Sequence, residues 1–275
     1  MSQIIQAHGA SIPAIGLGTW MLNGPACSDA VEAAIGFGYR HIDTAIGYSN
    51  ESEVGEGIRR SGIARDHLFL TTKIPPEQLA HDDMMRAAEG SLKRLGVDQV
   101  DLLLIHWPSK SLSATKTIRS LNAVKERGLT RHIGVSNYTI RLLDEAWAAT
   151  SAPIVANQCE HHPYLDQPAL RAATAAHGTA FVAYCPLGQA EVLDEPVIQD
   201  IAGRFGRTPA QIVLRWQVQK GCVAIPKSSH PARIRQNLDI FSFELSGDDV
   251  AAIDALGSTQ RRICDFASIA PDWDV

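Results

Sequence analysis

Short apolar runs recur along the chain, and segments with helical spacing of apolar residues lie between them. The runs are rich in β-branched residues and leucine, which is typical of parallel strands buried on both faces. They predict strands over Ile15–Gly18, His41–Asp43, Leu68–Lys73, Asp101–Trp107, His132–Val135, Ile154–Gln158, Ala180–Tyr184 and Cys222–Ile225. Strands that alternate with helices in this way indicate a parallel α/β sheet.

The segments between these strands predict the helices of the same repeat. They cover Ser28–Phe37, Glu51–Arg60, Asp82–Leu95, Lys116–Arg127, Ile140–Thr150, Gln167–His177 and Pro209–Val218. Two extra C-terminal helices, Pro231–Leu238 and Gly247–Leu256, are expected beyond the eighth strand. The pattern therefore predicts an α/β protein of the (β/α)8 TIM barrel class.

Two short extended segments precede the repeats. Ile4–Gln6 and Ser11–Ile15 flank His8-Gly9-Ala10, a turn-forming sequence, so we expect an N-terminal β-hairpin that closes the barrel floor. No Ser/Gly-rich linker or shift in composition divides the chain. Residues 1–275 are therefore expected to form a single domain.

Composition narrows the range of functions. A chain of 275 residues with 45% hydrophobic residues can bury one large core, and a net charge of −5 gives no general attraction to nucleic acid or anionic membranes. The 5 cysteines are widely spaced and form no CxxC pair, which favours reduced thiols over a disulfide framework or a zinc site. Met1–His8 lacks a basic segment leading into an apolar stretch, so we expect a cytoplasmic protein.

Polar or aromatic residues stand at or near the end of every predicted strand. They are Trp20, Asp43, Lys73, His106, Asn137, Gln158, Tyr184 and Lys227. A parallel barrel gathers the C-terminal ends of its strands around one mouth, where active sites of this fold lie. We therefore expect these residues to converge on one site that takes a small molecule.

Tyr48 follows Asp43 within the same predicted loop. An ion pair between Asp43 and Lys73 beside Tyr48 would favour the phenolate through the lysine charge, and His106 could hydrogen-bond the same reacting oxygen. Bringing the phenol pKa from about 10 toward neutrality by about three units requires roughly 4 kcal/mol, much of which a desolvated lysine could supply. Tyr48 is thus a candidate proton donor. The alternative is that Asp43 and Lys73 form only a structural ion pair.

These residues and their contexts closely resemble those of the aldo-keto reductase family, over nearly the whole chain. The matching blocks, in order, are Gly16-Leu-Gly-Thr-Trp20, Asp43-Thr-Ala, Gly134-Val-Ser-Asn137, Asn157-Gln158, Tyr184-Cys-Pro-Leu-Gly188 and Ile225-Pro-Lys-Ser228. The segment Gly128-Leu-Thr-Arg-His-Ile-Gly and the ending Ala270-Pro-Asp-Trp273 are most similar to bacterial 2,5-diketo-D-gluconate reductases.

The resemblance implies a catalytic tetrad of Asp43, Tyr48, Lys73 and His106. It also implies NADPH as the cofactor, with hydride passing to a carbonyl carbon while Tyr48 protonates the oxygen. The expected substrates are small dicarbonyls such as methylglyoxal, or keto-sugars such as 2,5-diketo-D-gluconate. A monomer is expected.

The expected cofactor site divides into a nicotinamide end and a phosphate end. Amide and hydroxyl groups would bind the carboxamide, Tyr184 would stack on the ring, and Arg233 with Lys227 would hold a 2′-phosphate near a helix N-terminus. The full set is Thr19, Ser136, Asn137, Gln158, Tyr184, Pro186, Leu187, Gly188, Ile225, Lys227, Ser228, Arg233, Gln236 and Asn237. Gln236 stands where the family commonly has a glutamate. No GxGxxG follows a strand, so a Rossmann site is not supported.

Several residues allow two interpretations. Trp20, Ile46, Trp107 and Trp273 are expected to line the substrate pocket, although the tryptophans could instead be packing groups. Glu51 could cap a helix or support the site. His161 and His162 lack a matching carboxylate spacing, so no metal is predicted.

Two other functions are compatible with part of the pattern. Lys73 could act as a Schiff-base nucleophile in a lyase, with Asp43 and Tyr48 as proton shuttles. A nucleotide sensor could keep the cofactor site without useful turnover. The cations near Pro231 and the amide groups argue against the lyase.

Overall fold

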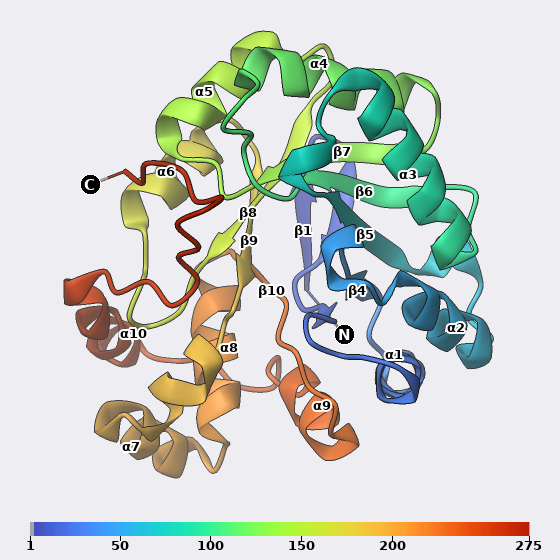
Figure 1. Cartoon of the computed structure of the whole chain (residues 1–275). Coiled ribbons are helices and arrows are strands. Elements are labelled where there is room, and N and C mark those ends of the chain that lie inside the picture. The colour runs from blue at the N-terminus through green and yellow to red at the C-terminus, as the bar shows by residue number, and fades with distance from the viewer. Residues whose placement is uncertain (1–2, 275) are drawn as a thin grey trace.

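The computed structural model describes residues 3–274. Its main sheet contains 8 parallel strands in the order β10-β9-β8-β7-β6-β5-β4-β3 (Figure 1). The strands are β3 (Leu17–Gly18), β4 (His41–Asp43), β5 (Phe69–Ile74), β6 (Val100–Ile105), β7 (Thr130–Ser136), β8 (Ile154–Glu160), β9 (Ala180–Tyr184) and β10 (Val223–Ala224). The prediction of a (β/α)8 barrel is confirmed.

The two edge strands of this sheet meet and close the barrel. The Gly16 amide donates to the Ala224 carbonyl at 2.9 Å, and the Gly18 amide donates to the Pro226 carbonyl at 3.0 Å. A Cβ atom on Gly18 would lie 2.7 Å from the Ile225 carbonyl oxygen, so a glycine is required where the two backbones approach this closely. The seam between the first and last barrel strands is therefore held by backbone contacts.

Helices surround the sheet on its outer face (Figure 1). They are α1 (Pro25–Phe37), α2 (Glu51–Ser61), α3 (His81–Leu95), α4 (Ala114–Glu126), α5 (Ile140–Ala149), α6 (Pro168–Ala176), α7 (Pro196–Phe205), α8 (Pro209–Gln219), α9 (Pro231–Leu238) and α10 (Gly247–Asp254). Both helices predicted beyond the eighth strand are present. Of these, α9 contacts α1 and α8 and so completes the ring, whereas α10 packs against α7.

Helix α7 was not predicted, although Ile198, Ile201 and Phe205 have helical spacing. The first two of these side chains are buried in a separate apolar cluster with Trp216 of α8 and Ile253 of α10. No helix within residues 3–274 is both long enough and apolar enough to cross a membrane.

The N-terminal hairpin closes the barrel floor, as predicted. Strands β1 (Ile4–Ala7) and β2 (Ala10–Pro13) pair antiparallel around His8-Gly9, whose φ angles are +46° and +84°. Positive φ at both central residues is the requirement of a type I′ turn. The fully buried Ala10 and Ile12 pack with side chains of the barrel interior, including Leu102 and Val155. The opposite end of the barrel remains available for a site.

Candidate active site

Lys73 and Asp43 form a buried ion pair below the barrel mouth. The Lys73 Nζ donates to Asp43 Oδ1 at 2.5 Å and to the Thr44 carbonyl at 2.9 Å. The side chains are 0% and 2% exposed. Gln158 Nε2 donates to the other carboxylate oxygen at 2.8 Å. Both buried charges therefore have partners, which their desolvation requires.

The loop after β4 holds Tyr48 beside this ion pair. Tyr48 ends a short 3-10 turn, Ile46–Tyr48, and its hydroxyl lies 3.4 Å from Lys73 Nζ. Asn50 fixes the loop, because its Nδ2 donates to the carbonyls of Thr19 and Leu22 at 2.8 Å each. The sequence thus delivers a phenol and a carboxylate to one place, as expected.

Burial raises the pKa of Tyr48 above its ordinary value of 10.0. The Lys73 charge acts in the opposite direction, but Asp43 raises the pKa again. The expectation that Lys73 brings this pKa toward neutrality is therefore wrong. The main reason is burial, which outweighs the Lys73 charge; Nζ also lies closer to the Asp43 carboxylate, at 2.5 Å, than to the phenol, at 3.4 Å. A raised pKa keeps Tyr48 protonated at neutral pH, as a proton donor must be.

His106 lies beside Tyr48 just after β6. The two rings meet edge to face, with centroids 5.5 Å apart. Burial and, secondarily, the Lys73 charge lower the pKa of His106 to about 3. The imidazole is therefore neutral at physiological pH and offers one N–H donor and one acceptor nitrogen.

Lys73 itself is favoured in its charged form. Burial disfavours the ammonium, but the charges of Asp43 and Tyr48 and their hydrogen bonds raise the pKa above its ordinary value. A protonated lysine is held within hydrogen-bonding distance of the phenol. It can stabilise the phenolate that forms when Tyr48 gives up its proton.

A cavity of about 1070 Å³ opens at the C-terminal ends of the strands. It is lined by most of the residues that the sequence indicated. They are Thr19, Trp20, Asp43, Tyr48, His106, Trp107, Ser136, Asn137, Gln158, Tyr184, Pro186, Leu187, Ile225, Lys227, Ser228, Arg233, Gln236 and Asn237. Lys73 lies below this lining and reaches it through Asp43 and Tyr48.

A hydrogen-bonded group of polar side chains forms the middle of the cavity. Tyr184 Oη donates to Asn137 Oδ1 at 2.7 Å, and Asn137 Nδ2 donates to the His106 carbonyl at 3.0 Å. Ser136 Oγ donates to the Gln158 carbonyl at 2.8 Å. These contacts fix the side chains before any ligand binds. The Gln158 side chain uses one of its two N–H donors on Asp43, so its second N–H and its side-chain oxygen Oε1 remain for a ligand.

Exposed cations line the far end of the cavity. Lys227 follows β10, and Arg233 lies in the first turn of α9. The N-cap residue of α9, His230, makes no side-chain cap, so the first N–H groups of the helix point outward without that acceptor. Two cations beside a helix N-terminus favour an anionic group such as phosphate.

Besides Lys73, three predicted residues do not line the cavity. Ile46 packs against the main apolar cluster, and Gly188 adopts a φ of +53° below Leu187. Trp273 lies behind Trp107, with ring centroids 6.2 Å apart, and Arg262 lies 3.6 Å above its ring. Trp273 is therefore not part of the cavity lining, and in the structure its ring packs against Trp107.

The structure adds residues that the sequence did not indicate. Phe266 and Ile269 of the C-terminal segment line the cavity together with Pro75 and Cys185. The position of the C-terminal segment depends on long-range contacts, which no local pattern reveals. Cys185 follows Tyr184 directly, so its place beside the cavity could have been inferred.

Glu51 hydrogen-bonds to β5, the strand that carries Lys73, and stabilises it. Its buried carboxylate accepts hydrogen bonds from Thr72 Oγ1 at 2.6 Å and Arg94 Nε at 2.8 Å, and also from Ser91. Of the two roles considered for Glu51, the geometry favours support of the site. The contact with Thr72 places Glu51 one residue away from Lys73.

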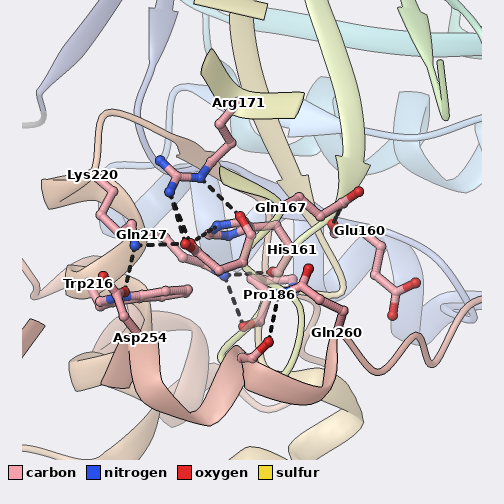
Figure 2. A network of polar contacts seen from close by, with 12 residues as sticks. Glu160, His161, Gln167, Arg171, Pro186, Trp216, Gln217, Lys220, Asp254 and Gln260 are labelled. Atoms are coloured by element: carbon pink, nitrogen blue, oxygen red, sulfur yellow. Dashed lines mark hydrogen bonds and ion pairs between the residues drawn. The ribbon is translucent and has the colours of Figure 1, made fainter. Parts of the chain in front are cut away.

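A polar network behind the cavity joins two loops of the mouth (Figure 2). Gln217 Nε2 donates to the His161 carbonyl at 2.8 Å and to the Pro186 carbonyl at 3.1 Å. The His161 ring stacks on Trp216, and its Nε2 lies 3.2 Å from Asp166. The cavity wall at Pro186 is thus attached to α8.

The fold and the site together define a barrel enzyme of the carbonyl-reducing class, and comparison with known proteins agrees. The sequence model of the Aldo/keto reductase family matches residues 14–258, so the chain belongs to this family. It is 45% identical over 243 residues to 2,5-diketo-D-gluconic acid reductase B of Corynebacterium sp. (strain SHS752001), covering 88% of each chain.

Two further proteins extend the comparison. The chain is 42% identical over 255 residues to glyoxal reductase of Bacillus subtilis (strain 168), with 92% of each chain covered. A crystal structure of a Bombyx mori aldo-keto reductase in complex with NADP superposes with a TM-score of 0.92 at 32% identity. That match covers 98% of this chain and 96% of the other. The chain is therefore an oxidoreductase that acts on carbonyl groups.

Proposed function

We propose that the protein is an NADPH-dependent reductase of aldehydes and ketones, with Tyr48 as the proton donor. The observation that carries this proposal is one cavity lined both by a buried acid, Tyr48, and by two cations, Lys227 and Arg233. An extended dinucleotide fits such a cavity, with its nicotinamide beside Asn137 and Tyr184 and its 2′-phosphate beside Arg233. The NADP complex of the Bombyx mori relative supports the same cofactor.

When bound, NADPH would supply the hydride. Tyr48 would donate a proton to the carbonyl oxygen, to which neutral His106 would hydrogen-bond. Lys73 would stabilise the resulting phenolate, and Asp43 would keep the lysine charged and oriented. Gln158 would hydrogen-bond the carboxamide of the nicotinamide. Because Gln158 also donates to Asp43, it would link that carboxamide to the proton-transfer residues.

Two substrate classes follow from the relatives' names, namely small dicarbonyls such as methylglyoxal and keto-sugars such as 2,5-diketo-D-gluconate. The pocket walls near Tyr48 favour the neutral dicarbonyls. Trp20, Trp107 and Phe266 give this end an aromatic surface, and Glu77 is the charged residue beside it. The lining cations Lys227 and Arg233 are assigned to the 2′-phosphate, so they are not expected to bind a substrate carboxylate. A steady-state screen of NADPH oxidation with both classes tests this preference for neutral dicarbonyls over keto-sugar acids.

The lyase alternative is disfavoured by the geometry of Lys73. Its side chain is 0% exposed, and its ammonium is bound by Asp43 and the Thr44 carbonyl. A protonated, fully buried lysine is a poor nucleophile. Borohydride treatment in the presence of a carbonyl compound should therefore leave no adduct on Lys73.

Arg233→Ala is expected to weaken NADPH binding selectively. The dissociation constant of NADPH should rise about tenfold, and that of NADH less than about twofold, because only the former carries the 2′-phosphate. Quenching of tryptophan fluorescence by each nucleotide at low salt measures both constants. The control is Arg235→Ala, because this exposed arginine of α9 does not line the cavity. Equal losses for both nucleotides would contradict the phosphate assignment.

The pH dependence of reduction follows from the two shifted pKa values. His106, with a pKa of about 3, stays neutral above about pH 5, and Tyr48, with a pKa raised above 10.0, stays protonated up to about pH 9. The kcat at saturating NADPH should therefore be constant over this window and fall as pH rises through the Tyr48 pKa. An ionisation near pH 7 in the kcat profile would show that the Tyr48 environment has been misassigned.

A further inference from the structure

The C-terminal tail, residues 260–274, runs from α10 back across the barrel toward α5 and α6 (Figure 1). Phe266 and Ile269 of this tail line the cavity. The tail contains no helix or strand, so its path depends on the contacts that it makes with the barrel.

A single buried carboxylate holds the tail where it reaches the barrel. Glu160, at the end of β8, accepts the Ile263 N–H at 2.7 Å on Oε1. It accepts the Cys264 N–H at 3.2 Å on Oε1 and 3.1 Å on Oε2. The side chains of Glu160 and of its other partner, His162, are both 0% exposed. Hydrogen bonds to a buried carboxylate are among the strong ones in proteins.

The groups around Glu160 complete this attachment. His162 Nε2 lies 2.8 Å from Glu160 Oε1. Gln167 Nε2 donates to the Glu160 carbonyl at 2.5 Å, and Gln167 Oε1 accepts from Arg262 at 2.9 Å. Figure 2 shows Glu160 and Gln167 side by side in the polar network. Three consecutive tail residues are therefore attached to the end of β8.

Several other polar contacts of the tail are exposed. Arg261 pairs with Glu191 while both side chains are about half exposed. Lys110 Nζ donates to the Ala267 carbonyl at 2.7 Å at the surface. Exposed ion pairs contribute little because water competes for both partners. The contacts at Glu160 therefore differ from these in using a carboxylate that is fully buried.

We propose that Glu160 is a positioning residue that sets the size of the substrate pocket by fixing the tail over it. Glu160 does not line the cavity and acts through the backbone of Ile263 and Cys264, two residues before Phe266. The inference rests on the proposed carbonyl reductase function of the same cavity. It predicts that loss of the carboxylate changes the preference between large and small substrates and leaves NADPH binding intact.

The test compares Glu160→Gln with Glu191→Gln. With its oxygen at the Oε1 position, glutamine keeps the Ile263 contact but turns an NH2 group toward the Cys264 N–H and loses the charge of the carboxylate, so the attachment of the tail should weaken. The kcat/KM for a bulky aromatic aldehyde should fall about tenfold, mainly through KM, whereas that for methylglyoxal should change less than about threefold. The dissociation constant of NADPH should stay within about twofold. Glu191→Gln breaks an exposed contact of the same tail and should leave all three values unchanged.

A double-variant cycle with Phe266→Ala separates positioning from general destabilisation. In the wild-type background Phe266→Ala should also reduce turnover of the bulky aldehyde, and in the Glu160→Gln background it should add little, because the wall is already displaced. Independent, additive effects would overturn the proposal, as would equal losses for both substrates. If Glu160→Gln does not fold, Ile263→Pro removes one of the donated N–H groups at a tail residue that does not line the cavity, and the same selectivity change is expected. Absence of any carbonyl turnover by the wild-type protein would refute the proposed function instead.

Discussion

Replacing Tyr48 with phenylalanine is expected to lower kcat for carbonyl reduction by about a hundredfold to ten-thousandfold, the contribution usual for general acid catalysis. The variant loses only the hydroxyl that lies 3.4 Å from Lys73 Nζ, and it keeps the ring that packs edge to face against His106. The dissociation constant of NADPH should stay within about twofold, since the cofactor contacts are unchanged. Single-turnover oxidation of NADPH with methylglyoxal measures the step directly.

Tyr138→Phe is the matched control for this experiment. Its buried hydroxyl lies outside the cavity and has no hydrogen-bond partner within residues 3–274, so turnover should not change. Near wild-type turnover by Tyr48→Phe would show that another group, or water, protonates the carbonyl oxygen. His106 is the neighbouring candidate in that case, although its low pKa makes it a poor acid at neutral pH.

Lys73→Met is expected to destabilise the fold and to abolish most activity. The substitution keeps the length of the side chain but leaves the buried Asp43 with only Gln158 as a side-chain partner. Removing one member of a buried ion pair typically costs about 3–5 kcal/mol. Urea denaturation at pH 7, followed by circular dichroism, measures the loss of unfolding free energy. Turnover is measured on the same preparation under conditions where the variant is folded.

The double variant Asp43→Asn, Lys73→Met separates stability from chemistry. A neutral asparagine still accepts a hydrogen bond from Gln158 and no longer requires a countercharge, so a large part of the lost stability should return. Activity should not return, because no cation is left to stabilise the Tyr48 phenolate. Recovery of both stability and turnover would mean that Asp43 and Lys73 form only a structural ion pair.

Much of the site could be predicted because the fold converts a linear pattern into a spatial one. Asp43, His106 and Gln158 are far apart in the sequence, but parallel strands of a barrel bring their C-terminal ends to one mouth. Local signals, such as the apolar run before His106, were sufficient to locate the strand ends and so to predict which residues meet at the mouth. The depth of Lys73 below the cavity follows from strand register, which the sequence pattern did not specify.

Other properties depend on distances that a pattern cannot supply. The pKa of Tyr48 results from burial, Lys73 and Asp43 acting in different directions, so its net direction could not be read from residue types. The path of the tail, and with it the places of Phe266 and Trp273, depends on contacts with Glu160 over a separation of about a hundred residues. Such long-range contacts leave no periodic signal in the sequence.

The seam between the first and last barrel strands gives the chain an obligatory order of assembly. Thr19 and Trp20 line the cavity from one side of the seam, and Ile225 and Lys227 line it from the other. More than two hundred residues separate the two sides in the sequence, so the complete cavity forms only after the last strand has docked. A dinucleotide that contacts both sides would then hold the first and last strands of the barrel together. Affinity for the cofactor and cohesion of the barrel are thereby coupled, and each would strengthen the other.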